Sequence, residues 1–328
     1  MPLPPLPMDK AAAGVPPAAT LIFLTYNQQN YVREALLAAL AQQGPPVEIL
    51  ISDDASSDAT WDVILATIAG YQGPHQIRLN RNSANLGVTA HINLCAALAS
   101  SDILVAAAGD DMSESDRVQK VCAVFANGTP LLVHSRVTPF PTPPPGVVQP
   151  YEAAGLLHGL PLVRLALSQG LYIGATGAWH RDIFRLFGPL PDRDCYEDLI
   201  LGFRAALGNR VAFIDAPLVR YRINVGISAQ ITMPLQGEAW RAVRLQALRR
   251  NRVVQEQRLR DARCFGLPEA SPVIRALQRD LVAQEMRAAF HTLPAGRYLR
   301  QFAQRPLLAL RIGLSEGKRL RRAARGAD

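Results

Sequence analysis

Long hydrophobic runs are missing from this chain of 328 residues. No stretch approaches the roughly 18 apolar residues that a membrane-spanning helix requires, so the sequence predicts no transmembrane segment. The first residues are rich in proline and alanine, and they lack the basic start and apolar block of a signal peptide. We therefore expect residues 1–19 to form a disordered leader on a cytoplasmic protein.

The cysteine and histidine spacings of metal sites are also missing. The four cysteines show no CxxC spacing, and the histidines show no HxxxH spacing. Reduced cytosolic thiols are the simplest interpretation, and no zinc site is expected. Cys195 lies three residues before Asp198, but without a paired histidine it is not expected to act as a nucleophile.

A glycine-rich phosphate loop does not follow the first strand-like run, residues 21–26. Neither the Walker pattern GxxxxGK[ST] nor the dinucleotide pattern GxGxxG is found there. A P-loop NTPase and a dinucleotide-binding Rossmann protein are therefore not supported. Any phosphate bound by this chain needs another anchor.

Basic residues are concentrated at one end of the chain. Residues 236–328 contain 20 Lys and Arg against 8 Asp and Glu, which leaves 15 against 19 of the chain's 35 and 27 for residues 1–235. The slightly acidic first part argues against nucleic acid as the main substrate. The basic part has Arg, Leu, Ala and Val at helical spacing. We expect it to lie on an anionic membrane surface, or to pack on the preceding residues or on a second subunit.

Segments with the apolar spacing of strands alternate with segments that have the apolar spacing of helices in the first half of the chain. Apolar residues at helical spacing follow each of the short strand-like runs, which lie at residues 21–26, 47–52, 76–80 and 102–108. This alternation predicts an α/β domain with a mostly parallel central sheet over residues 20–235, followed by a helical C-terminal extension over residues 236–328.

Weaker signals cover the second part of the α/β domain. They predict a proline-rich loop at 139–150, a short helix near 160–167, an irregular segment at 173–182, a helix that begins at Glu197–Asp198 and a strand at 211–223.

Two acidic pairs, Asp53–Asp54 and Asp110–Asp111, directly follow strand-like runs. Because the carboxyl ends of parallel strands meet at one edge of a sheet, the two pairs should converge where such folds bind ligands. Four carboxylates at one place repel each other unless a cation or hydrogen-bond donors offset their charge. Mg²⁺ and similar hard cations bind carboxylate and phosphate oxygens. The sequence therefore predicts a metal-assisted nucleotide site.

Five ordered blocks resemble family 2 inverting glycosyltransferases with a GT-A fold. They read TYNQQNYVREALLAALAQQ, ILISDDASSDAT, NLGVTAHINLCAALASSDILVAAAGDD, YEDLILGFRAAL and RYRINVGIS. The resemblance covers roughly residues 20–228. It implies a GT-A type nucleotide-diphospho-sugar transferase fold and the transfer of a sugar, with inversion, from a nucleotide-diphospho-sugar to an acceptor hydroxyl. Mg²⁺ or Mn²⁺ is the implied cofactor.

The resemblance also implies roles for single residues. Asp198 would be the general base, supported by Glu197. Asp110 and Asp111 would hold the metal ion, and Trp179 could stack on an acceptor sugar. Arg220 and Arg222 could offset leaving-group charge, and we expect at most one of them to point into the site. The nucleotide-binding residues would be Thr25, Tyr26, Asn27, Asp53, Asp54, Asn85, Asp110 and Arg222.

Each role has a structural alternative. Asn27 could cap the next helix, Asp53 and Asp54 could form an Asx turn, and the pair at 110–111 could cap a helix that starts near Ser113. Glu197 and Asp198 could merely favour the positive end of a helix dipole. Trp179 could be a core or interface residue.

The chain departs from the family pattern at two positions. Ala108 stands where the fuller family form has another acid, and Asn224 stands where many relatives carry a histidine. The resemblance places the protein in cell-surface polysaccharide or lipid-linked glycan synthesis, with a glycan or lipid-linked acceptor. The basic residues 236–328 favour a peripheral position on the inner face of the membrane. The rivals are a non-catalytic nucleotide-sugar or glycan-binding protein of the same fold and a nucleotidyltransferase, which the missing basic glycine-rich loop disfavours. The oligomeric state is left open.

Overall fold

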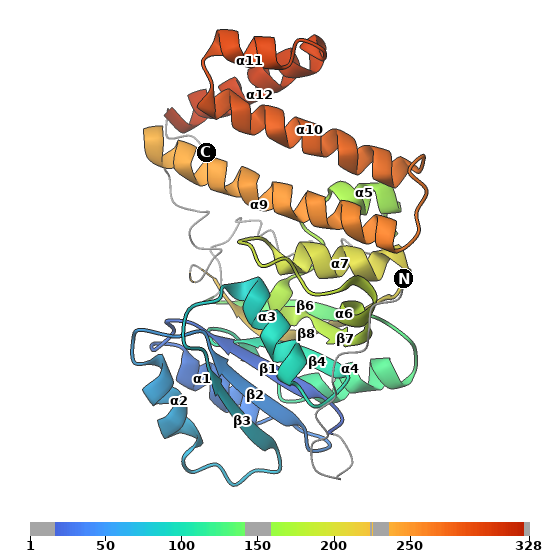
Figure 1. Cartoon of the computed structure of the whole chain (residues 1–328). Coiled ribbons are helices and arrows are strands. Elements are labelled where there is room, and N and C mark those ends of the chain that lie inside the picture. Colours follow the sequence, from blue (N-terminus) through green and yellow to red (C-terminus); the bar gives the residue numbers. More distant parts are fainter. Residues whose placement is uncertain (1–16, 142–158, 224, 226–235, 325–328) are drawn as a thin grey trace.

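The computed structural model describes residues 17–141, 159–223, 225 and 236–324. Its centre is an eight-stranded sheet with the order β3-β2-β1-β4-β7-β6-β8-β5 (Figure 1). Four strands from the first third of the chain pair in parallel, namely β1 (Thr20–Thr25), β2 (Glu48–Asp53), β3 (Gln76–Arg81) and β4 (Ile103–Ala108).

The other half of the sheet mixes directions. β6 (Leu132–Phe140) and β8 (Val211–Arg222) pair in parallel. β7 (Ala178–His180) lies antiparallel between β4 and β6, and the short β5 (Met112–Ser113) lies antiparallel beside β8. The predicted α/β class with a mostly parallel central sheet is confirmed.

Helices cover both faces of the sheet because strand side chains alternate between them. Ile22, Leu50 and Leu104 belong to one buried cluster, whereas their strand neighbours belong to the other. The first cluster includes residues of α3 (Val88–Leu98) and α7 (Glu197–Leu207), and the second includes residues of α1 (Val32–Leu40), α2 (Thr60–Ile68) and α4 (Arg117–Ala126).

Helix α1 illustrates how the sequence produces these layers. Its buried residues recur at helical spacing, so one face is apolar and packs on the sheet; they are Val32, Ala35, Leu36, Ala39 and Leu40. The helix ends before Gly44, which has a positive φ of 103°, and the two prolines that follow. The predicted helices after β1, β2, β3 and β4 are all present.

Four expectations need correction. The predicted proline-rich loop cannot begin at residue 139, because β6 extends to Phe140. The leader cannot extend to residue 19, because Ala19 is fully buried and its carbonyl accepts a hydrogen bond from the Glu48 N–H. Ser113 does not start a helix; it ends β5, and α4 begins at Arg117. The irregular segment at 173–182 contains a 3₁₀ turn, η2 (Gly174–Thr176), and strand β7. Residues 1–16 and 142–150, in the expected leader and loop, lie outside the described residues.

Four helices follow the sheet and form the C-terminal part of the described chain. The longest two are α9 (Gly237–Cys264) and α10 (Pro272–Thr292). α7 lies between α9 and the sheet, and α5 (Leu162–Leu167) packs against α10, α9 and α7 (Figure 1). α6 (Asp182–Phe187) is a short helix beside β7. The other two C-terminal helices are α11 (Ala295–Gln301) and α12 (Pro306–Ala324). Among the helices that the structure describes, none is both long and apolar enough to cross a membrane.

A buried ion pair fastens α9 to α7. The Arg204 Nε atom donates to Asp261 Oδ2 at 2.9 Å, and the exposed fractions of the two side chains are 0% and 1%. Arg204 also donates to the Gly188 carbonyl at 2.8 Å. The first helix of the basic extension therefore packs on the preceding domain, which is one of the alternatives that its composition left open.

We predict that Asp261→Ala lowers the free energy of unfolding by about 3–5 kcal/mol, because it leaves the Arg204 guanidinium buried without a counter-charge. Denaturant unfolding measures this loss. Glu269→Ala is the matched control, because it breaks a solvent-exposed pair with Arg263 and should change the free energy of unfolding far less. Equal effects of the two substitutions would contradict the importance of the buried pair.

Candidate functional site at the carboxyl edge of the sheet

The carboxyl ends of β1, β2 and β4 meet as the sequence predicts. Thr25 pairs in register with Asp53, and Leu24 pairs with Ala108, so both acidic pairs begin at the same edge. The Gly109 N–H donates to the Leu24 carbonyl at 2.9 Å. A Cβ atom on Gly109 would clash with the side chains of Gln28 and Thr25, which explains why glycine precedes the second pair.

Asp53 is fully buried and engaged in local hydrogen bonds. Its Oδ2 accepts from the Ser56 N–H at 3.0 Å, its Oδ1 accepts from the Thr25 hydroxyl at 3.2 Å, and the Ser56 hydroxyl also donates to it. This is the Asx-type turn that was the alternative to nucleotide binding. Asp53 therefore shapes the edge of the site, and a direct contact with a nucleotide stays a prediction.

Asp54 holds the loop that contains Asn85. Its Oδ1 accepts from Asn82 Nδ2 and from the Leu86 N–H, both at 2.8 Å, and its Oδ2 accepts from the Gly87 N–H at 2.9 Å. Gly87 has a φ of 78°, a backbone conformation that favours glycine. Asn85 is exposed in this loop and is free to meet a ligand from solvent.

The loop after β1 presents an exposed aromatic ring. Tyr26 is 46% exposed, whereas the Asn27 side chain is used to join two loops, because its Oδ1 accepts from the Ser57 N–H at 2.9 Å. Asn27 does not cap α1, whose N-cap residue is Tyr31. Of the predicted Thr25–Tyr26–Asn27 group, Tyr26 is thus the residue with a surface on which a base could stack.

The second acidic pair carries poorly compensated negative charge. Burial, followed by the charge of Asp110, raises the pKa of Asp111 to about 7. Burial also raises the pKa of Asp110, although a hydrogen bond with Gln28 and the charge of Arg222 lower it. Asp111 Oδ1 accepts from the backbone N–H of Arg222 at 2.8 Å. A capping role ahead of α4 is not observed, since α4 begins six residues after Asp111.

Arg222 contacts this pair directly. Its guanidinium lies 4.2 Å from the ring centre of Phe140 and 4.8 Å from that of Tyr31, and its Nε donates to the Asp110 carbonyl at 3.0 Å. Arg220 shares the same face of β8 and lies over Phe140 at 5.1 Å. The Arg222 Nη2 atom also donates to Glu34 Oε2 at 2.7 Å. Because both arginines lie over Phe140 on one face, the expectation that at most one of them points into the site stays a prediction.

The residues at this edge fit a divalent cation that takes most of its ligands from a substrate. No group of three or more His, Cys, Asp and Glu side chains that could hold a metal exists among the described residues. The raised pKa values of Asp110 and Asp111 mean that an added positive charge would stabilise both carboxylates. Mg²⁺ is commonly held by one or two carboxylates, substrate phosphates and water. Ala108 adds no ligand, and Asn224 lies outside the described residues.

Glu197 and Asp198 form the first turn of α7 and lie against the η2 turn. A Cβ atom on Gly174 would clash with the Glu197 carboxylate, so the close approach depends on that glycine. Burial raises the pKa of both acids, and the charge of Asp198 raises that of Glu197 further. A helix N-terminus favours ionised acids and would lower these values. Burial therefore outweighs the dipole, and the helix end alone does not explain the pair.

Arg117 connects the two groups of acids, and sequence reasoning missed it. Its Nη2 donates to the Ala175 carbonyl in η2 at 2.9 Å, and the charge of Asp111 acts on it from the other side. Burial lowers the pKa of Arg117 to about 10. An available signal was its spacing, since Arg117 lies four residues before the buried Val121 on the apolar face of α4.

Arg258 of α9 is a second residue that sequence reasoning missed. It is fully buried, and it donates to the Leu199 carbonyl at 3.0 Å, the Ala166 carbonyl at 3.0 Å and the Ser168 carbonyl at 2.9 Å. Its positive charge lowers the pKa of Asp198 against the effect of burial. The basic extension thus contributes a cation beneath the start of α7.

Trp179 requires a correction. It is 1% exposed, lies within the buried cluster on one face of the sheet, and its Nε1 donates to the Tyr172 hydroxyl at 3.1 Å. The indole therefore has no exposed face on which an acceptor sugar could stack. Trp179 contacts the surroundings of the site through Tyr172, whose pKa is raised first by burial and then by the charges of Asp198 and Glu197.

The acidic edge of the sheet lies in the part of the chain that matches a known family. Residues 20–163 match the sequence model of Glycosyl transferase family 2, and they contain both acidic pairs. This part of the chain is thus similar to glycosyl transferase family 2. The matched family 2 segment ends before Glu197, Asp198 and Arg222, so the roles of these residues depend on the geometry described above.

Comparison with known proteins gives one similar sequence and two similar folds. An uncharacterized protein of Mycobacterium tuberculosis is 38% identical over 93 residues, or 28% of this chain, and the match spans about a quarter (26%) of that relative. The fold is similar to S. aureus TarS solved with UDP-GlcNAc, with a TM-score of 0.55 and 16% identity over 94% of this chain and 90% of that one. It is also similar to the Pyrobaculum calidifontis mannosyltransferase PcManGT solved with GDP-Man and Mn²⁺, with a TM-score of 0.56 and 18% identity over 97% of this chain and 89% of that one. The fold is therefore of the GT-A type.

Proposed function

We propose that this protein is an inverting glycosyltransferase that moves a sugar from a nucleotide-diphospho-sugar to an acceptor hydroxyl. The observation that carries the proposal is the buried pair Glu197–Asp198 at the start of α7, connected through η2 and Arg117 to the acidic pair Asp110–Asp111. The pair Glu197–Asp198 can accept a proton, and the pair Asp110–Asp111 can hold the donor diphosphate through a cation.

Asp198 acts as the general base in this proposal. The acceptor oxygen attacks the anomeric carbon while its proton passes to the Asp198 carboxylate, and the bond from that carbon to the diphosphate breaks with its electron pair on the leaving oxygen. The raised pKa makes Asp198 a stronger base than an ordinary aspartate. Its Oδ1 is oriented by the Leu199 N–H at 2.8 Å. Direct displacement forms no sugar–enzyme intermediate and inverts the anomeric carbon.

Asp110 and Asp111 are the residues that would hold Mg²⁺ or Mn²⁺. When bound, the ion neutralises charge on the donor diphosphate and on the departing nucleoside diphosphate. Arg222 is oriented by Tyr31 and Phe140 beside the same acids, and its Nη2 pairs with Glu34 Oε2 at 2.7 Å. Exchange of Glu34 for a phosphate would let its guanidinium offset further leaving-group charge. Tyr26 and Asn85 face solvent at the same edge, where the nucleoside would bind.

The donor class is supported by the ligands of the similar structures, which are UDP-GlcNAc and GDP-Man. For the acceptor we propose a glycan or lipid-linked glycan used in cell-surface polysaccharide synthesis, and we propose that the reaction takes place in the cytoplasm. Nucleic acid is not proposed as a partner, because residues 1–235 carry more acidic than basic residues. A non-catalytic sugar-binding protein would not need the buried base at 198, and a nucleotidyltransferase would release pyrophosphate instead of a nucleoside diphosphate.

The role of Asp198 is tested with Asp198→Asn. The amide keeps the shape of the side chain but cannot accept a proton, so turnover should fall about 10²–10⁴-fold while donor affinity is nearly unchanged. Turnover, measured as release of free nucleoside diphosphate, and melting temperature are recorded on the same samples. Glu197→Gln should be milder. Near-wild-type transfer by a folded Asp198→Asn protein would exclude Asp198 as the base.

The metal site is tested by calorimetry with UDP and Mn²⁺. Asp110→Ala and Asp111→Ala should lose the metal dependence of nucleotide binding, whereas Asn224→His should retain or strengthen it, because imidazole ligates divalent ions and a carboxamide does so weakly. Asp116→Ala is the matched control, since Asp116 pairs with Lys120 on the surface. If both alanine variants bind UDP with unchanged metal dependence, this pair is not the metal site.

The contribution of Arg258 is tested by the pH profile of kcat/KM. The base must be ionised, so activity should rise with pH through the pKa of Asp198, above the ordinary aspartate value of 3.8. Because the Arg258 charge lowers that pKa, Arg258→Gln should move the acid limb to higher pH, and Arg258→Lys should keep it close to wild type. An unchanged limb in a folded Arg258→Gln protein would limit Arg258 to a structural role.

A further inference from the structure

Helix α12 has one face that is buried and one that is open. Ala309, Ile312, Glu316 and Ala323 are buried against the rest of the molecule. Three leucines lie on the opposite face, where Leu307 is 82%, Leu310 is 55% and Leu314 is 56% exposed. Their spacing of three and four residues forms a stripe along one side of a helix. With a rise of 1.5 Å per residue, the stripe is about 10 Å long.

A buried ion cluster fixes the direction of this open face. Glu316 Oε1 accepts from Arg244 Nη2 at 2.6 Å, and its Oε2 lies 3.0 Å from His291 Nε2. Ala289, Tyr298 and Phe302 pack with α12 in a separate small core. The leucine stripe therefore cannot turn inward without breaking this cluster and core, and it is a fixed feature of the folded protein.

The charge around the stripe has one sign. Residues 295–324 contain eight Lys and Arg and a single acid, Glu316, whose side chain is 1% exposed and faces the interior. Arg311 and Lys318 line the same hollow as the leucines, a surface depression of about 420 Å³. Arg321 and Arg322 are exposed one helical turn further along.

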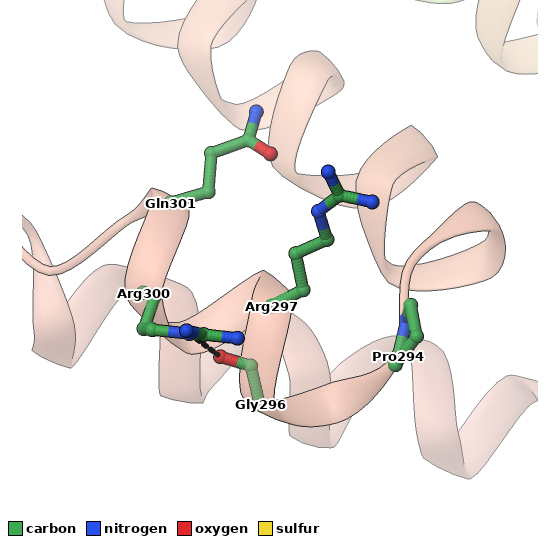
Figure 2. A pocket seen from close by; sticks show the side chains of 5 residues that line it. All are labelled: Pro294, Gly296, Arg297, Arg300 and Gln301. Atoms are coloured by element: carbon green, nitrogen blue, oxygen red, sulfur yellow. Dashed lines mark hydrogen bonds between the residues drawn. The ribbon is translucent and has the colours of Figure 1, made fainter.

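The neighbouring helix α11 adds a second basic hollow of about 790 Å³ (Figure 2). It is lined by Pro294, Gly296, Arg297, Arg300 and Gln301. The Arg297 side chain extends into the open space, whereas the Arg300 Nε atom donates back to the Gly296 carbonyl at 3.3 Å (Figure 2). α11 and α12 lie at the end of the molecule away from β3 and α2 (Figure 1).

We propose that the exposed face of α12, with its leucine stripe and basic residues, docks on the surface of a bilayer that contains anionic phospholipids. Leucines enter the interface between headgroups and acyl chains, and the arginine and lysine side chains bind lipid phosphates beside them. A second copy of the chain is a poorer occupant, because two such faces would bring several unpaired positive charges together. The proposal is independent of sugar transfer, so its test uses binding alone.

The test is flotation of the whole protein with lipid vesicles. Wild type should float with phosphatidylcholine vesicles that contain phosphatidylglycerol and stay behind with pure phosphatidylcholine vesicles. Leu307→Gln/Leu310→Gln/Leu314→Gln should weaken binding at least about a hundredfold, since burial of each leucine contributes about tenfold. Arg311→Gln/Lys318→Gln/Arg321→Gln/Arg322→Gln should also weaken it at least a hundredfold, because each basic group near an anionic surface contributes about fivefold.

The control variant is Leu37→Gln/Leu65→Gln/Leu186→Gln, which changes three exposed leucines that lie on α1, α2 and α6. It should bind as wild type does, and melting temperatures establish that all variants fold. Equal flotation with neutral and anionic vesicles, no flotation with either, or full binding by the α12 leucine variant would overturn the proposal. So would a wild-type dimer in light scattering that the α12 leucine variant abolishes, because a second copy would then be the occupant.

Discussion

Six carboxylates lie around one edge of the sheet, largely shielded from bulk water. The groups that compensate their negative charge determine how the rest of the site is arranged. Asp53 and Asp54 are stabilised by several hydrogen-bond donors of neighbouring loops, and Asp53 Oδ2 also lies 3.4 Å from Arg81 Nε. The pairs at 110–111 and 197–198 have fewer hydrogen-bond donors around them, and burial raises the pKa of each of these four acids. The first two acids therefore shape the site, whereas the other four have negative charge left over for a cation or a proton.

The C-terminal helices are part of this electrostatic arrangement. α9 supplies Arg258 beneath the first turn of α7 and Asp261 to the buried pair with Arg204. Both contacts fix α7, and α7 carries the proposed base at its start. Removal of the helices would expose the apolar side of α7 and withdraw the cation that lowers the pKa of Asp198. The basic composition of this region thus has two physical origins: buried arginines that hold α7, and exposed ones on α11 and α12.

The sequence predicted the parts of the site that follow from local periodicity. Strand-like runs before Asp53 and Asp110 determined that both acids would meet at one edge, since parallel strands end together. Arg117 and Arg258 were missed, because an arginine on an amphipathic helix usually faces solvent and tertiary packing buries these two. The spacing of Arg117 from the buried Val121 was the signal that could have identified the first of them. The acceptor-binding role of Trp179 was wrongly predicted, because a tryptophan suits a buried core as well as a surface that binds a sugar. The start of α4 was also misplaced, because pairing with β8 draws Met112 and Ser113 into a strand.

The central claim, direct displacement by an acceptor oxygen that Asp198 activates, is tested most directly by the anomeric configuration of the product. Nuclear magnetic resonance during the reaction identifies the linkage formed first from a donor of known configuration, before any later equilibration of free sugar. Direct displacement predicts that the product has the configuration opposite to that of the donor. A first-formed product with the configuration of the donor would contradict the account, because retention requires an intermediate or a same-face attack that an aspartate base does not provide.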